Sequence, residues 1–202
     1  MNTITRAAFI RKGSVFAVSV ALLGCRHPVV SGHTPECQTT DDILGPFYRA
    51  DAPIRTDMRV AGDLGAVLIV EGTVYSDDCV TPLSGALVEV WQADGTGAYD
   101  TASSDFRYRA SLVSGEDGAY AFNTNLPGKY LNGSQFRPSH IHFQVTAEGH
   151  RTLVSQVYFE GDPDIAADPW ASSAAAEARI LTVTELDSGE LLVNFDIYLV
   201  LA

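Results

Sequence analysis

Short runs of β-branched and aromatic residues, each ended by turn-forming residues, follow one another from residue 67 to the C-terminus. Such runs, separated by segments rich in Gly, Pro, Asp and Ser, are typical of antiparallel strands in a β-sandwich. One alanine-rich stretch, Ser172–Arg179, predicts a short helix. We therefore expect an all-β fold, an antiparallel β-sandwich with one short helix and long active-site loops. The predicted strands are Val67–Tyr75, Ala86–Trp91, Tyr108–Val113, Ala119–Asn123, His140–Thr146, Leu153–Phe159, Ile180–Leu186 and Leu191–Leu201.

The size and charge of the chain limit both its organisation and its partners. Its 202 residues, of which 46% are hydrophobic, suffice for one core but not for two large domains. With 25 acidic residues against 13 basic ones, the formal net charge is -12. Such an acidic chain repels phosphate backbones, which argues against a nucleic-acid partner. We expect one domain over residues 44–202.

Residues 1–24 have the organisation of a signal peptide. Basic residues at positions 6, 11 and 12 precede the apolar run 14–24, which is about half the ~20 residues that a transmembrane helix needs. The sequence LLGC at residues 22–25 resembles the lipobox of bacterial lipoproteins. This resemblance implies cleavage before Cys25, a lipid on its sulfur, and an exported protein anchored in the cell envelope. An ordinary secretory signal is the alternative.

Residues 25–43 are polar and rich in turn formers, and we expect them to form a tether in which His27 and His33 are solvated. Cys37 and Cys79 are the cysteines left once Cys25 carries lipid. An even pair in an oxidising compartment predicts a disulfide. Because the sequence does not give the distance between the two residues, two buried free thiols are the alternative.

Two histidines and two tyrosines are the candidate metal ligands. His140 and His142 are two residues apart in a predicted strand, so both imidazoles lie on one face and can bind one ion. An H-x-H pair alone also occurs in zinc sites, in copper sites and by chance. Tyr99 and Tyr130 would add two phenolate oxygens. Phenolates are hard donors and imidazole suits iron, copper and zinc, so this set favours ferric over ferrous iron.

A set of motifs runs in order through residues 44–201. It includes the stretch 70–99 (VEGTVYSDDCVTPLSGALVEVWQADGTGAY), with LGPFY at 44–48 and GEDGAYAF at 115–122. Further motifs are LPGKY (126–130), FRPSHIHF (136–143), SQVYFEGDP (155–163) and NFDIYL (194–199). Together they resemble the intradiol ring-cleavage dioxygenases, and most of all the protocatechuate 3,4-dioxygenase branch of that family.

This resemblance implies a function and a role for each site residue. The implied Fe(III) ligands are Tyr99, Tyr130, His140 and His142. Tyr130 would be the axial tyrosinate that substrate displaces. Arg137 would lie beside the substrate and stabilise negative charge, and Gln156 would line the same cavity. The implied reaction uses O2 to cleave a catechol-type ring between its two hydroxyl-bearing carbons, giving a cis,cis-muconate-type dicarboxylate.

A non-catalytic cell-surface module that binds a ligand on the same sandwich is the alternative function. The remaining aromatic residues are expected to serve packing. Tyr48 is expected either at the mouth of the pocket or as an anchor for the N-terminal segment. The oligomeric state is left open. The residues expected in packing roles are Tyr75, Trp91, Tyr108, Tyr120, Tyr158, Trp170 and Tyr198.

Overall fold

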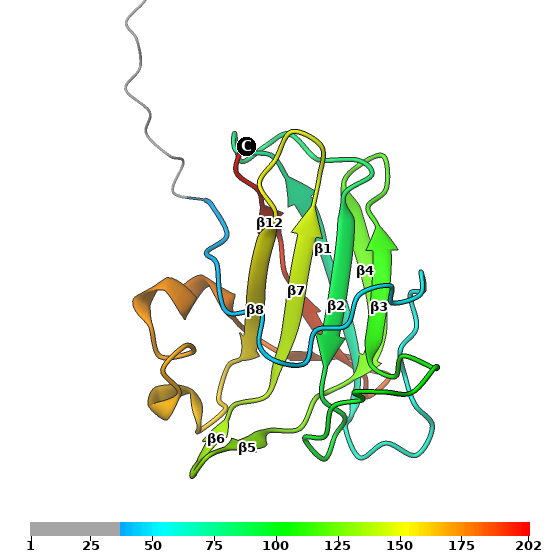
Figure 1. Ribbon diagram of the computed structural model, residues 1–202, viewed down its shortest axis with the longest axis vertical. Coiled ribbons are helices and arrows are strands. Elements are labelled where there is room, and N and C mark those ends of the chain that lie inside the picture. The colour runs from blue at the N-terminus through cyan, green and yellow to red at the C-terminus, as the bar shows by residue number, and fades with distance from the viewer. Residues whose placement is uncertain (1–36) are drawn as a thin grey trace, which may run out of the picture. The chain divides into compact units, whose positions relative to one another are not determined.

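The computed structural model describes residues 37–202, which form two packed β-sheets and a separate hairpin (Figure 1). The predicted signal peptide, the lipobox cysteine Cys25, and the tether histidines His27 and His33 lie outside the described residues. Among the residues that are described, no helix has the length and apolar character needed to cross a bilayer.

The first sheet has five strands and is built around β1 (Val67–Tyr75). β1 pairs with β4 (Ala119–Asn125) in the antiparallel direction. It pairs with β11 (Leu191–Asn194) and β12 (Ile197–Tyr198) in the parallel direction. β10 (Thr184–Glu185) extends the sheet beyond β11.

The second sheet also has five strands, in the order β3 (Arg109–Val113), β2 (Leu87–Gln92), β7 (His140–Thr146), β8 (Leu153–Phe159) and β9 (Ile180–Leu181). Neighbouring strands in it are antiparallel, except for the parallel pair β8 and β9.

The hairpin and the two short helices lie outside both sheets. The hairpin consists of β5 (Tyr130–Asn132) and β6 (Gln135–Arg137). The predicted alanine-rich helix is present as the 3₁₀ helix η2 (Ala174–Arg179), and a second 3₁₀ turn, η1, spans Ile165–Ala167.

The predicted β-sandwich is confirmed, and β1, β7 and β8 have the predicted bounds. The differences are the parallel pairs, the unpredicted hairpin β5–β6 and the division of the last two predicted strands into shorter ones. Between β11 and β12 the carboxylate of Asp196 accepts the backbone N–H of Thr73 at 2.9 Å. A side chain thus replaces a backbone acceptor there, which interrupts the strand.

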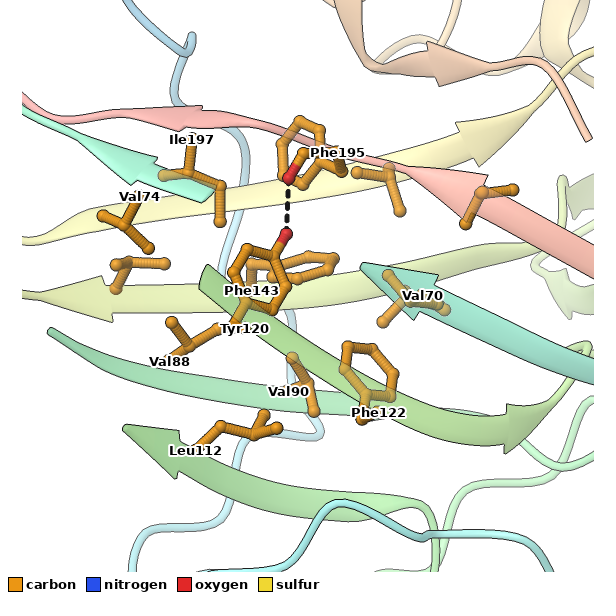
Figure 2. Close-up of a cluster of buried hydrophobic side chains, with 14 of the residues drawn as sticks. Val70, Val74, Val88, Val90, Leu112, Tyr120, Phe122, Phe143, Phe195 and Ile197 are labelled. Carbon is orange, nitrogen blue, oxygen red and sulfur yellow. Dashed lines mark hydrogen bonds between the residues drawn. The ribbon is translucent and has the colours of Figure 1, made fainter. Parts of the chain in front are cut away.

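The core lies between the two sheets and is almost entirely apolar (Figure 2). The hydroxyl of Tyr120 donates to the backbone oxygen of Phe195 at 2.6 Å, as the dashed line in Figure 2 shows. A Cβ at Gly72 would lie 2.0 Å from the same oxygen, so glycine is required where β1 passes this segment. The labelled core residues are Val70, Val74, Val88, Val90, Leu112, Tyr120, Phe122, Phe143, Phe195 and Ile197.

The segment from residue 37 to residue 48 covers the outer face of the second sheet, crossing β8, β7 and β2 (Figure 1). Asp42 N–H bonds to the backbone oxygen of Val154 at 2.8 Å, and Tyr48 Oη donates to Glu89 at 3.0 Å. A Cβ at Gly45 would lie 3.1 Å from the His142 ring, and φ there is +71°. This glycine allows the segment to run directly over the histidine.

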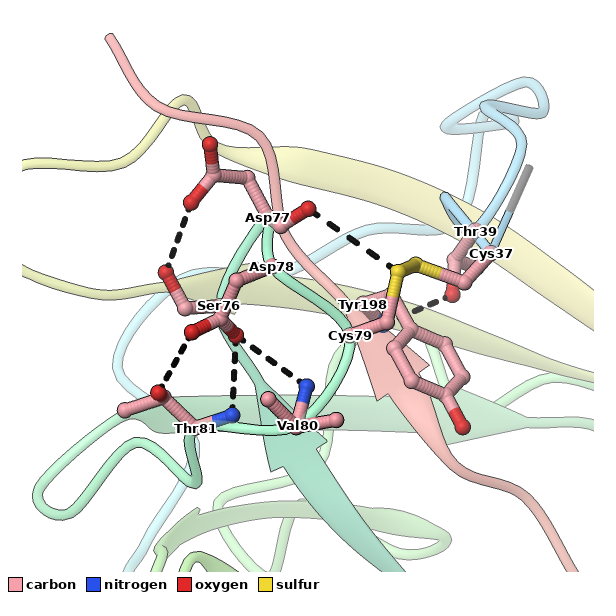
Figure 3. The surroundings of a disulfide bond; sticks show 9 residues. All are labelled: Cys37, Thr39, Ser76, Asp77, Asp78, Cys79, Val80, Thr81 and Tyr198. Carbon is pink, nitrogen blue, oxygen red and sulfur yellow. Dashed lines mark hydrogen bonds between the residues drawn. A yellow bond between two sulfur atoms is a disulfide. The ribbon is translucent and has the colours of Figure 1, made fainter. Parts of the chain in front are cut away.

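A disulfide between Cys37 and Cys79 fixes the start of this covering segment, as predicted (Figure 3). The two Cα atoms are 6.0 Å apart, and the residues are separated by 42 positions in sequence. Next to the bridge, Thr39 Oγ1 accepts the backbone N–H of Tyr198 at 2.9 Å. The segment is therefore joined both to the β1–β2 loop and to β12.

Candidate metal centre

The two predicted histidines lie at the start of β7 on its outer face. His140 is 2% exposed and His142 is 1% exposed. In the sheet, His142 is directly opposite Trp91 of β2 and Gln156 of β8. The Trp91 indole stacks on the His142 ring, with centroids 4.9 Å apart and ring planes 7° apart. This stacking fixes the plane of the imidazole.

Tyr99, in the loop after β2, brings its hydroxyl to both imidazoles. Its Oη lies 3.2 Å from Nε2 of His140 and 3.2 Å from Nε2 of His142. Phe47 of the covering segment stacks on the Tyr99 ring with centroids 4.2 Å apart. Side chains from two distant motifs therefore meet at one buried point.

Tyr130, the first residue of β5, completes the aromatic cluster. Its ring centroid lies 5.7 Å from that of Tyr99 and 5.7 Å from that of His140. Gly97 explains how the two tyrosine segments approach each other, because a Cβ there would lie 2.2 Å from the backbone oxygen of Lys129. All four predicted ligands are thus brought together.

Burial keeps both imidazoles neutral. Burial and the positive charge of Arg137 lower the pKa of His140 to about 4. Burial and the charge of His140 hold the pKa of His142 well below its usual value. Nδ1 of His140 donates to the backbone oxygen of Pro138 at 2.6 Å, so the lone pair of the neutral ring is on Nε2, toward Tyr99. Burial also raises the pKa of Tyr99.

These polar groups cannot all be satisfied by one another. Tyr99 has a single hydroxyl proton, which only one Nε2 can accept. Nδ1 of His142 makes no hydrogen bond, although the backbone of Ile43 is near enough to favour the charged ring. Either tautomer of His142 therefore leaves a buried polar atom without a partner. A cation bound between the two Nε2 atoms and the phenol oxygen of Tyr99 would accept their lone pairs.

The donor set decides which ion fits. Within residues 37–202, no three His, Cys, Asp or Glu side chains are grouped as a metal site, so any ion here depends on the phenols. Two phenolates bring two negative charges and hard oxygen donors, and imidazole accepts a borderline ion. The residues present therefore fit a trivalent, redox-active ion such as Fe(III).

Arg137 is opposite Tyr130 in the β5–β6 hairpin and is 2% exposed. Its Nε donates to Asp168 Oδ2 at 2.9 Å, and its Nη2 donates to Gln156 Oε1 at 3.1 Å. Burial alone would lower the pKa of Arg137, but the Asp168 hydrogen bond and nearby negative charge outweigh it and raise that pKa. Arg137 is therefore a fixed positive charge beside the cluster, and Gln156 orients it.

Tyr158 and Trp170 were predicted to serve only packing, but both contact Arg137. Arg137 Nη2 donates to Tyr158 Oη at 3.2 Å, and the Trp170 ring lies 4.4 Å from the guanidinium carbon. Behind them is the buried ion pair of Arg179 and Asp42, 2.6 Å apart. Tyr158 Oη donates to Asp42 at 3.0 Å, which joins the two arginines into one network.

Sequence reasoning missed Phe47, Asp42, Asp168 and Arg179. The only signal for Phe47 was its place in the LGPFY motif. The two aspartates had none, because nothing in the sequence distinguishes them from the other acidic residues. Tyr48 proves to be an anchor, since its hydroxyl bonds to Glu89 and its ring packs edge-on against Trp91.

The other tyrosines serve packing, as predicted. Tyr75 and Tyr198 stack on each other with centroids 5.1 Å apart. Tyr108 donates its hydroxyl to Asp63 at 2.6 Å, and Tyr120 lies in the core.

Several known proteins are similar to this chain in sequence and in fold. Residues 43–201 match the profile of the family described as dioxygenase. Hydroxyquinol 1,2-dioxygenase of Rhodococcus opacus is 36% identical over 181 residues, which cover 79% of this chain and 57% of the relative. Chlorocatechol 1,2-dioxygenase of Rhodococcus opacus is 33% identical over 174 residues, which cover 74% of this chain and 66% of the relative. The chain belongs to the intradiol dioxygenase family.

A solved structure agrees with this membership of the intradiol dioxygenases. The dioxygenase domain of a dioxygenase–carbohydrate-binding fusion protein from Streptomyces sp. SirexAA-E superimposes with a TM-score of 0.71 at 32% identity. The match covers 82% of this chain and 99% of that domain. The chain thus matches a whole dioxygenase domain but less than two thirds of the length of the two curated relatives.

Proposed function

We propose that the chain is a non-haem, Fe(III)-dependent intradiol dioxygenase that cleaves a catechol-type ring with O2 to a cis,cis-muconate-type dicarboxylate. The observation that carries this proposal is the approach of Tyr99 Oη to Nε2 of both His140 and His142, beside the ring of Tyr130. Burying the two imidazoles costs stability that apolar residues would not cost. A binding module would have no use for this arrangement.

Tyr99, Tyr130, His140 and His142 would hold the iron. When bound, ferric iron would supply one chemistry: it draws electron density from a chelated catecholate so that the ring reacts with O2 without an external reductant. The protein's own groups then bind and orient the substrate, hold protons and place charge.

Tyr130 is assigned to proton transfer. A catechol loses two protons when it binds through both oxygens, and Tyr130, if it holds the iron as a phenolate, could accept one of them. Tyr130 lies on the β5–β6 hairpin, outside both sheets. Its ring packs edge-on against Phe47, so a displacement of the ring would break this contact but no pairing within either sheet.

Arg137 is assigned to charge stabilisation. With Nε bound to Asp168 and Nη2 bound to Gln156, the guanidinium cannot rotate away. A fixed cation stabilises both the bound catecholate and the oxyanion that develops during the reaction, without reorganisation. Gln156 acts by holding Arg137.

The charges around the site favour catechols without an acidic substituent. The chain has a formal net charge of -12, and the two buried arginines of the site network are already paired with Asp168 and Asp42. Neither of these two arginines is free to pair with a ring carboxylate. The names of the two curated relatives point the same way, whereas the motif resemblance predicts the protocatechuate branch. A substrate panel separates these two predictions.

The test is oxygen uptake by ferric-loaded protein with catechol, hydroxyquinol, chlorocatechol and protocatechuate, followed by identification of the product. We expect red-brown protein whose colour changes with a catechol under nitrogen, and a muconate-type product. Protein that stays colourless after ferric loading and takes up no oxygen would instead support a ligand-binding module.

We also propose that the protein is exported and held in the cell envelope by lipid on Cys25. Three sequence features support this proposal: basic residues at positions 6, 11 and 12, the apolar run 14–24, and the lipobox-like sequence LLGC at residues 22–25. Mass spectrometry of the mature N-terminus should show a diacylglyceryl cysteine, and Cys25→Ser should release the protein from the membrane fraction. A mature N-terminus that begins elsewhere and carries no lipid would show an ordinary secretory signal.

A further inference from the structure

Three buried side-chain polar atoms within residues 37–202 make no hydrogen bond, and all three belong to one row across the second sheet. They are Nη1 of Arg109, Nε1 of Trp91 and Nδ1 of His142. Arg109 of β3 is directly opposite Trp91 of β2, which is opposite His142 of β7. Unsatisfied buried groups are rare in proteins and are often found at functional sites. This row begins at the predicted metal ligand and ends at a charged residue.

Arg109 is unusual among the buried arginines. It is 1% exposed, yet no carboxylate forms a salt bridge with it in the described part of the chain. Arg137 and Arg179, by contrast, each contact a buried aspartate, at 2.9 Å and 2.6 Å. A buried cation without an anion is strongly unfavourable. Arg109 is therefore the one buried arginine of the described residues that no carboxylate contacts directly.

The contacts of Arg109 lead to Tyr99. Its Nε and Nη2 both donate to the backbone oxygen of Asp100, the residue after Tyr99, at 3.0 Å and 2.7 Å. The carboxylate of Asp100 is itself bonded to Ser103 and Arg49. The remaining guanidinium nitrogen, Nη1, is buried and makes no hydrogen bond. As a metal ligand, Tyr99 would carry the negative charge that Arg109 lacks.

We propose that Arg109 is a positioning residue of the metal centre, which holds the Tyr99 loop through Asp100 and supplies the counter-charge for Tyr99 as an anionic ligand. The Arg109 side chain donates only to the backbone oxygen of Asp100, next to Tyr99, and to none of the predicted ligands themselves. Its effect should therefore appear in the affinity for the ion rather than in the handling of substrate. This inference rests on the proposed function, because it requires that Tyr99 binds a cation.

The experiment measures the ferric-ion affinity of the full-length protein by competition with a chelator, with the tyrosinate colour as the signal. Arg109→Gln removes the charge, whereas Arg109→Lys keeps it. Arg55→Gln is the matched control, because Arg55 also donates to backbone oxygens of this region, including that of Arg109 at 3.0 Å, and is not assigned to the site. The apparent KM for catechol is measured on each fully loaded protein.

We expect Arg109→Gln to weaken ferric binding by about tenfold to a hundredfold. Arg109→Lys and Arg55→Gln should stay within a few-fold of the wild type, and KM should be unchanged. Equal affinity in Arg109→Gln and the wild type would overturn the inference. Equal weakening in Arg109→Gln and Arg109→Lys would overturn the role of the charge, and equal weakening in Arg55→Gln would show general loosening of the loop.

Two further outcomes keep the inference separate from the proposed function. If Arg109→Gln does not fold, the comparison of Arg109→Lys with Arg55→Gln decides: wild-type affinity in Arg109→Lys supports the counter-charge, and its loss contradicts it. If the wild-type protein itself takes up no ferric ion, the proposed function fails whatever the variants do.

Discussion

The two faces of the second sheet are both buried, but they differ in chemistry. On the inner face Ile141 and Phe143 are fully buried among apolar side chains. On the outer face His142 and Gln156 are just as inaccessible, and polar groups surround them. Hydrophobic transfer stabilises the first face, whereas the second must satisfy each polar atom or lose stability. The buried polar residues of the outer face are therefore not explained by folding stability alone.

Consecutive residues of β7 make the comparison most direct. His142 and Phe143 have the same backbone environment, with side chains that point to opposite faces. The outer face is closed by the covering segment rather than by a sheet, and that segment is fixed by the Cys37–Cys79 bridge and the Asp42–Arg179 pair. A buried polar site thus forms on a sheet whose other face supplies the core.

Replacement of His142, on the outer face, should have the largest effect on ferric-ion affinity and a smaller effect on folding stability. We expect His142→Ala to weaken ferric binding by more than about a hundredfold and to abolish oxygen uptake. The free energy of unfolding of the metal-free protein should fall less than for a ring of the apolar core, because Nδ1 of His142 has no partner and only the Nε2 contact with Tyr99 and the stacking on Trp91 are lost. Gln144→Ala, on the same face but outside the cluster, is the control. Normal iron affinity in His142→Ala would contradict the ligand assignment.

Replacement of the inner-face neighbour should have the opposite effect. Phe143 packs against Phe122, Tyr120 and Phe195 with ring centroids 5.2–6.4 Å apart. We expect Phe143→Ala to lower the free energy of unfolding by about 3–5 kcal/mol, because it leaves a cavity in a closely packed core. Denaturant unfolding measures this loss. Any protein that remains folded should still bind ferric ion, and loss of iron without loss of stability would break the comparison.

The inner face could be predicted from the sequence because its physics is local. Runs of β-branched and aromatic residues between turn signals give β1, β7 and β8 with their observed bounds, and the spacing of His140 and His142 places both on one face. The prediction that Tyr99 and Tyr130 lie beside the two histidines came instead from the family resemblance. Spacing along the chain says nothing of loops that join different strands.

The rest of the site could not be predicted, because its partners come from distant segments. Asp168 lies 31 positions from Arg137, and Asp42 lies 137 positions from Arg179. Neither aspartate differs in its local sequence from an exposed acidic residue. The parallel pairs of β1 were missed for a similar reason, because alternation defines a strand but not the direction of its neighbour.

Loss of the disulfide should show how independently the covering segment is held. We expect Cys37→Ser with Cys79→Ser to lower the free energy of unfolding by about 2–4 kcal/mol, because a closed loop limits the unfolded chain. Iron affinity should change little, because the Asp42–Arg179 pair, at 2.6 Å, holds the segment nearer the site. Thermal unfolding and chelator competition measure the two effects. A large loss of iron would show that the bridge itself positions Gly45 and Phe47.

The smallest expected effect is a dependence of stability on pH that belongs to the outer face alone. The pKa of His140 is about 4 in the folded protein, against roughly 6.5 in an unfolded chain. As the pH falls below about 6.5, the unfolded chain binds a proton that the folded protein does not, so stability decreases progressively down to about pH 4. For this residue the loss between pH 7 and pH 5.5 is on the order of 1 kcal/mol.

His140→Gln should remove this part of the pH dependence in metal-free protein, because glutamine does not titrate. Phe143→Leu, on the inner face, should lower stability by the same amount at each pH and leave the profile parallel to that of the wild type. The measurement is urea unfolding at several values between pH 7 and pH 5. If the profiles of His140→Gln and the wild type are parallel instead, the buried imidazole is not held neutral, and the outer face lacks the free Nε2 lone pair that metal binding requires.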